Sequence, residues 1–163
     1  MTHIESIVAM LKRDVEMVKM TLGDLSDTEM LVRSVPGANH AAWQIGHLVV
    51  AESRLVNAAV PGAVPAAPEG YTDKFNKETA KNDDPNFFPK KAELLENLTK
   101  ARGATIAWAQ TLKPADLEKT IPPPTDRFAP NVGLLLHALP LHVGMHLGQF
   151  QVLRRKLGRP VLF

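Results

Sequence analysis

The chain has 163 residues, 45% hydrophobic and 22% charged, which excludes a disordered protein and predicts a single domain over residues 1–163. It has no cysteine, which excludes thiolate metal sites, disulfides and a cysteine nucleophile. Its formal net charge of +2 is too small to make a nucleic-acid-binding surface. The chain shows no signal-peptide pattern and no apolar run of about 18 residues, so we expect a cytoplasmic protein without membrane or nucleic-acid partners.

Apolar residues at helical spacing predict a first helix over residues 4–22. Thr2 and Glu5, three residues apart, form a capping box at its start. The same pair of residue types recurs from Ser26, which predicts a short helical turn over residues 26–31.

Two further long helices are predicted after the first, over residues 40–59, where Asn39 is a suitable N-cap, and over residues 89–112. Between them, residues 60–89 are rich in proline and irregular, with room for a short helix over residues 72–80. An irregular segment of this length usually has a function, and we expect it to act as a lid. The core stripe of the helix over residues 89–112 is predicted to consist of Leu94, Leu98, Ala101, Thr105, Trp108 and Leu112.

A fourth helix is predicted over residues 131–157, after a second irregular stretch. Pro140 lies inside it and should kink or divide it. The stretch from Val132 to Leu147 carries no charge and is apolar on every side, which favours burial against a second chain and a homodimer along the fourth or the first helix. Because no segment alternates with period two, the fold class is all-α. We expect a four-helix bundle with long irregular connections between helices 2 and 3 and between helices 3 and 4.

Three histidines are the best candidates for chemistry. His142 and His146 are four residues apart on one helix face, a spacing that suits two ligands of one metal ion. His47 lies on the inward face of the second helix and could supply a third ligand. The alternative is that all three are buried polar residues, each with its own hydrogen-bond partner.

The residues around these histidines resemble the DinB-like superfamily of metal-binding four-helix bundles. The resemblance rests on Ala42-Trp43-Gln44-Ile45-Gly46-His47-Leu48 and on His142-Val143-Gly144-Met145-His146-Leu147-Gly148-Gln149. It implies that His47, His142 and His146 bind one divalent metal ion. Three imidazoles leave a position open, as in catalytic sites, but imidazole suits Zn, Ni, Fe and Cu alike, so the metal is not identified.

Four other residues are candidates for substrate binding or for support of the metal ligands. His40 could line the mouth of the pocket or lie exposed in the first turn of its helix. Trp43 is expected in the core and in the pocket wall. Arg54 could attract an anionic substrate or lie in solvent. Gln149 could donate a hydrogen bond near His146 or simply pack.

The resemblance also implies an activity. Members of the superfamily are similar to transferases and isomerases that use low-molecular-weight thiols such as bacillithiol or mycothiol, and others are described as hydrolases or as metal-binding proteins. We therefore expect a metal-dependent S-transferase or hydrolase acting on a small molecule. The alternatives are a non-catalytic, stress-related metal- or ligand-binding bundle and a structural homodimer with packed histidines.

Overall fold

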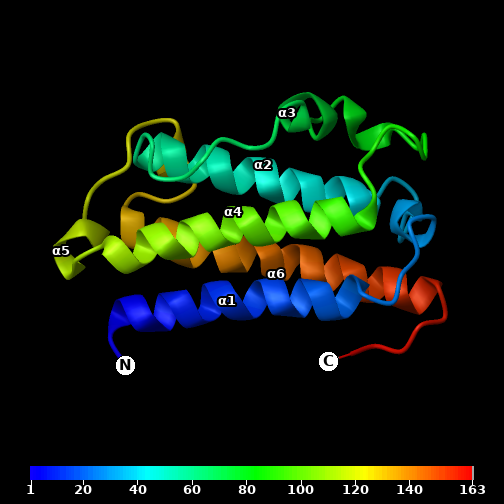
Figure 1. The fold of residues 1–163 in the computed structure, drawn as a ribbon, viewed down its shortest axis with the longest axis horizontal. Helices are drawn as coiled ribbons and strands as arrows, with labels where there is room; N and C mark the ends of the chain where they lie inside the picture. Colours follow the sequence, from blue (N-terminus) through cyan, green and yellow to red (C-terminus); the bar gives the residue numbers. More distant parts are fainter. Residues whose placement is uncertain (163) are drawn as a thin grey trace.

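The computed structural model describes residues 1–162 and consists of four long helices packed as a bundle (Figure 1). The long helices are α1 (His3–Leu22), α2 (Ala41–Ala59), α4 (Lys91–Thr111) and α6 (Val132–Lys156). The short ones are η1 (Glu29–Leu31), α3 (Tyr71–Lys74), η2 (Thr79–Lys81), α5 (Pro114–Leu117) and η3 (Thr125–Arg127). Within residues 1–162 the only β pairing is an isolated bridge between Thr120 and Asn131. The predicted all-α four-helix bundle is confirmed.

The order of the helices around the bundle differs from a simple up-down-up-down arrangement. Both α1 and α2 pack mainly against α4 and α6, so α1 and α2 lie across the bundle from each other. In Figure 1, α1 and α6 run in one direction, whereas α2 and α4 run in the other. Because α2 and α4 are parallel neighbours, the chain between them must return along the full length of the bundle. This is why the connection over residues 60–90 is long.

Side-chain caps lie at the starts of α1, α2 and α6, with one difference from prediction. The capping box of Thr2 and Glu5 is present. The N-cap of α2 is His40, whose Nδ1 accepts a hydrogen bond from the Trp43 N–H at 3.0 Å. The prediction of Asn39 as this cap is therefore wrong, because the imidazole acceptor satisfies the first turn instead.

Pro140 does not divide α6, which is assigned as one helix from Val132 to Lys156. The expected division is therefore wrong.

The buried face of α4 also differs from the predicted stripe. Leu94, Leu98 and Thr105 are buried as expected, but Trp108 is only half-buried and Arg102 is 2% exposed. An arginine reads as a solvent-facing residue in a hydropathy pattern, so the pattern selected Ala101 where the structure buries Arg102. Arg102 is buried because two carboxyl groups surround it, from Asp14 on α1 and Glu52 on α2.

The segment over residues 60–90 lies along α2 and is fixed there (Figure 1). Three aromatic residues of this segment, Tyr71, Phe75 and Phe88, are buried in the core. The Ser53 hydroxyl donates to the Pro65 carbonyl at 2.8 Å. The segment is therefore a packed cover on α2 in this conformation.

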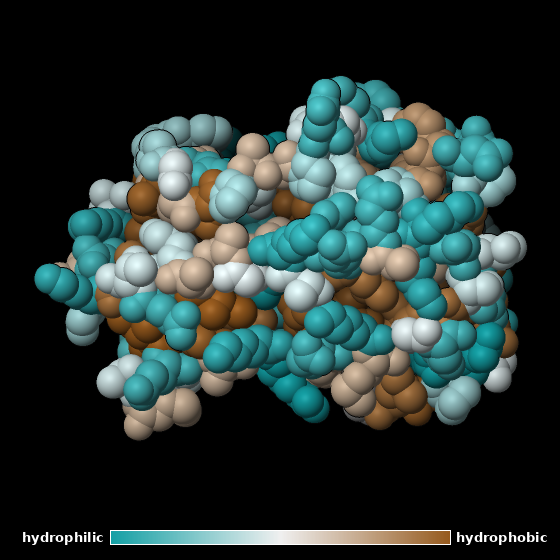
Figure 2. All heavy atoms as spheres, viewed as in Figure 1, coloured by the Kyte–Doolittle hydropathy of each residue, from teal (hydrophilic) through white to brown (hydrophobic). Residues whose placement is uncertain are grey.

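On the face shown in Figure 2, hydrophilic side chains cover much of the surface and apolar residues show between them. In the part of the chain that the structure describes, we found no helix with the length and apolar character that crossing a bilayer requires.

Candidate metal centre

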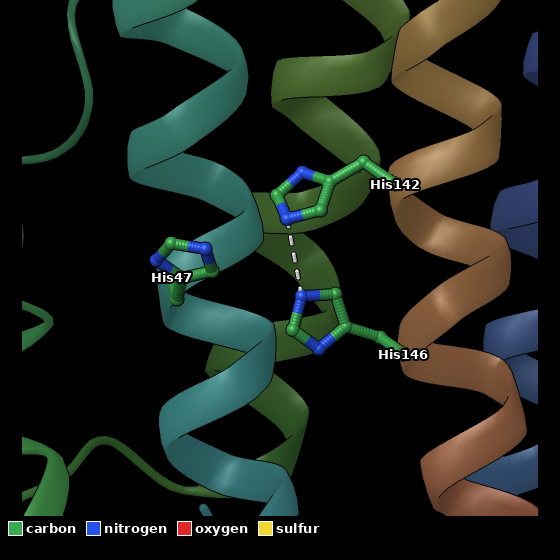
Figure 3. A group of neighbouring side chains, drawn as sticks. All are labelled: His47, His142 and His146. Atoms are coloured by element: carbon green, nitrogen blue, oxygen red, sulfur yellow. Dashed lines mark hydrogen bonds between the residues drawn. The ribbon is translucent and has the colours of Figure 1, made fainter.

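His47, His142 and His146 come together between α2 and α6, as Figure 3 shows. One ring nitrogen of each lies within 4.8 Å of the other two. The closest pair is His142 Nε2 and His146 Nε2, at 3.2 Å. His142 and His146 project from successive turns of α6 toward α2, so the helical spacing produces the convergence that the sequence indicated.

Gln44 fixes the orientation of His146. The side-chain oxygen of Gln44 lies 2.7 Å from His146 Nδ1, and its amide nitrogen donates to the Asn39 carbonyl. Because an amide oxygen only accepts hydrogen bonds, Nδ1 of His146 carries the proton and its Nε2 presents a lone pair. We did not predict this role of Gln44 from the sequence. The available signal was a glutamine three residues before His47, and therefore near it on the helix surface, in a stretch that is otherwise mostly apolar.

The three imidazoles are neutral at physiological pH. Burial lowers the pKa of His47 to about 4, with the neighbouring His142 and Arg54 acting in the same direction. Burial lowers the pKa of His146 to about 3, and it also lowers the pKa of His142. Neutral imidazole is the form that binds a metal, so burial keeps these side chains ready to act as ligands.

The donor set fits a divalent transition metal. The Nε2 atoms of His142 and His146 lie 3.2 Å apart, and the tautomer of His146 leaves a lone pair on its Nε2. The third ligand is the imidazole of His47, and the group contains no carboxylate. Nitrogen ligands of this kind suit Zn, Ni, Fe or Cu rather than Mg or Ca. Three protein ligands also leave room for a further ligand, as in catalytic sites.

Trp43 holds the His47 ring in place. The Trp43 ring stacks on the His47 ring, with centroids 4.9 Å apart and an interplanar angle of 7°. Trp43 is in turn fixed by its Nε1–H, which donates to the Asn76 carbonyl at 3.2 Å. A Cβ atom at Gly46 would lie 2.2 Å from the Phe75 ring, so only glycine lets the covering segment pack against α2 beside His47.

A groove of about 810 Å³ begins at Trp43 and His47 and continues between α2 and the covering segment. Arg54 is exposed and lines this groove, together with Asn57, Lys77 and Glu78. The groove is larger than the metal cluster needs and has room for a small-molecule substrate.

The remaining predicted residues lie outside the cluster. His40 is fully buried, and besides capping α2 its Nε2 lies 3.1 Å from the Asn82 carbonyl. The expectation of an exposed His40 is therefore wrong, and with both ring nitrogens engaged it has no free atom for substrate. Gln149 is exposed, so it does not pack, and Gln44 makes the contact with His146 that was considered for it.

The fold and the site together define a helical bundle whose three clustered histidines are suited to a divalent metal ion. The chain belongs to the DinB superfamily, whose family model matches residues 10–150. This confirms the resemblance seen in the sequence.

The solved structure of YfiT from Bacillus subtilis is similar to this chain, with a TM-score of 0.69 over 96% of this chain and 89% of that one, at 15% identity. YfiT is described as "a probable metal-dependent hydrolase with an unusual four-helix bundle topology". At this identity the likeness shows the fold alone. No curated protein matched the chain.

Proposed function

We propose that this protein is a metal-dependent enzyme acting on a small molecule, with one divalent ion bound by His47, His142 and His146. The observation that carries the proposal is the convergence of three neutral imidazole nitrogens within 4.8 Å, where one of the three residues, His47, also lines a substrate-sized groove. A bound ion would supply a Lewis acid able to lower the pKa of a water molecule or a thiol.

The chain's own residues would then position the reactants. Gln44 holds the His146 tautomer and Trp43 orients the His47 ring. Substrate would lie in the groove, where Arg54 offers a positive charge seven residues along α2 from His47. This arrangement favours a substrate that carries a negative group.

Two reaction types are open to such a site, transfer of a low-molecular-weight thiol and hydrolysis. The chain has no cysteine, so a thiol nucleophile would have to come from solution. The similarity to YfiT supports hydrolysis as the second type.

A panel assay tests this proposal. Metal-loaded protein is mixed with small thiols and a chlorinated aromatic or epoxide, and separately with ester and amide substrates, each with and without chelator. We expect chelator-sensitive turnover in one arm, reduced by Arg54→Gln when the substrate is anionic. If neither arm gives chelator-sensitive turnover, the enzyme proposal is wrong and a non-catalytic metal-binding bundle remains.

We also propose a homodimer through the outer face of α6. Leu134, Leu141, Met145 and Val152 are 41–69% exposed and lie at spacings of seven, four and seven, which places them on one side of the helix. The stretch from Val132 to Leu147 has no charged residue, so two copies of this face can meet around a twofold axis without burying a charge.

Light scattering at tens of micromolar should give twice the chain mass, and Leu141→Glu should give the monomer mass. A monomer mass for the unmodified protein would contradict the dimer.

A further inference from the structure

A second cavity lies on the α4 side of α2, separate from the metal cluster. It has a volume of about 270 Å³ and is enclosed by α2, α4 and residues 64–68. Most of its lining is aliphatic, contributed by Val49, Val64, Pro65, Ala66, Ala101 and Ala104. A dry protein cavity of about 150 Å³ accepts benzene, so this one has room for a ring with a short substituent.

One buried carboxyl group belongs to the lining of this cavity. Glu52 is 3% exposed, and its Oε1 has no hydrogen-bond partner within residues 1–162. Among the other polar side chains of the lining, Ser53 donates to the Pro65 carbonyl, and Thr105 donates to the Ala101 carbonyl and also lies near Glu52. The Asn97 amide donates to the Tyr71 hydroxyl at 2.6 Å, and Lys100 pairs with Glu96 at 2.6 Å.

The charges around Glu52 do not balance when all are ionised. Arg102 Nη2 lies 3.2 Å from Glu52 Oε2 and 3.3 Å from Asp14 Oδ2, and all three side chains are less than 10% exposed. One guanidinium therefore faces two carboxyl groups. Burial raises the pKa of Asp14 to about 7 and also raises that of Glu52, so the pair favours an added positive charge. A cation beside Glu52 would supply it.

We propose that this cavity binds a small organic ammonium, with the apolar body against Val49, Val64 and Ala104 and the ammonium donating to the Glu52 carboxylate. The site is distinct from the metal centre, although Ser53, Ala66 and Ala67 line both this cavity and the groove. The proposal does not depend on the enzymatic function proposed above.

Calorimetry with benzylamine and its neutral analogue benzyl alcohol tests the proposal. Both are titrated into His146→Ala protein in the presence of chelator, so that the amine cannot bind through a metal ion. We expect benzylamine to bind about tenfold or more tightly than the alcohol, the advantage of a hydrogen bond to a charged group. Glu52→Gln should remove this preference, and Ala104→Phe, which fills the cavity, should abolish binding of both probes.

Glu96→Gln is the matched control, since it removes an exposed carboxylate that does not line the cavity and should leave the preference unchanged. Equal affinities of the two probes in the parent protein would overturn the proposal. So would absence of binding, or a preference that survives Glu52→Gln. The comparison of the two probes in the His146→Ala protein that retains Glu52 still tests the proposal if the Glu52 variant does not fold.

Discussion

The bundle holds two buried polar clusters on different sides of α2, one of neutral side chains and the other of charged ones. The cluster between α2 and α6 consists of His47, His142 and His146, three neutral bases with no acid among them. The cluster against α1 and α4 consists of Asp14, Glu52 and Arg102, charged groups that contain most of their own counter-charge. His47 and Glu52 are five residues apart on α2 and therefore point in different directions.

The difference separates a site of neutral metal ligands from a cluster of charges that stabilise one another. Neutral imidazoles can be buried without a large electrostatic cost, and their lone pairs remain available to a cation from solution. A guanidinium and carboxylates are tolerated in the interior only together, so removing one leaves the others uncompensated. We therefore expect substitutions in the acidic cluster to affect stability and substitutions in the histidine cluster to affect metal binding.

The largest expected effect is on folding. Arg102→Met leaves Asp14 and Glu52 buried without a cation and should lower the free energy of unfolding by about 3–5 kcal/mol. Urea denaturation followed by circular dichroism measures it. Replacing Asp14, Glu52 and Arg102 together with apolar residues should recover most of the lost stability. A loss below about 1 kcal/mol for Arg102→Met alone would show that the two carboxyl groups do not depend on the Arg102 charge.

Removing a histidine of the cluster should reduce metal binding and leave stability almost unchanged. His146→Ala deletes one of three ligands and should cost most of the bound metal, while far-UV circular dichroism and the urea midpoint of metal-free protein change little. His137→Ala is the control, because His137 lies outside the cluster with its Nδ1 2.8 Å from the Gly133 carbonyl. Loss of helicity in His146→Ala protein would mean that this histidine is structural.

Gln44 should contribute less to metal affinity than a histidine ligand does. Gln44→Leu removes the acceptor that fixes the His146 tautomer but leaves all three imidazoles, and we expect metal affinity to fall about 10- to 100-fold. Competition with a chromophoric chelator gives the affinity. Gln149→Leu, at an exposed glutamine on the same side of α6, should have no effect. An equal effect of both substitutions would exclude the orienting role.

The smallest expected effect is on pH dependence. Protons compete with the metal only below the folded-state pKa values of its ligands, which burial lowers to about 4 for His47, to about 3 for His146 and below the ordinary value for His142. As the pH falls from 7 to 5, the affinity should therefore decline less than it would for three ligands of ordinary pKa near 6.5. A decline that begins near pH 6.5 would show that the imidazoles are protonated like exposed ones.

Much of this architecture could be predicted from the sequence, because hydrophobic periodicity and capping residues act locally. The four long helices, the capping box at Thr2 and the placement of His142 and His146 on one face follow from spacing alone. The buried Arg102 could not be predicted, since its partners come from two other helices that are distant in sequence.

The same limit applies around the metal centre. The roles of His40 and Gln44 depend on contacts with the Asn82 carbonyl and with His146, which only the packed bundle brings into reach. Spacing selected His142 and His146, and the inward face of the second helix together with the family resemblance added His47, but neither identified Gln44, which orients His146.

The central claim is that the histidine cluster binds one divalent ion per chain, and elemental analysis of untagged protein tests it most directly. We expect about one equivalent of a transition metal in the unmodified chain and a small fraction of that in His47→Ala, His142→Ala and His146→Ala proteins. Unmodified protein that stays free of metal after exposure to Zn, Ni and Fe, or variants that retain full occupancy, would contradict it.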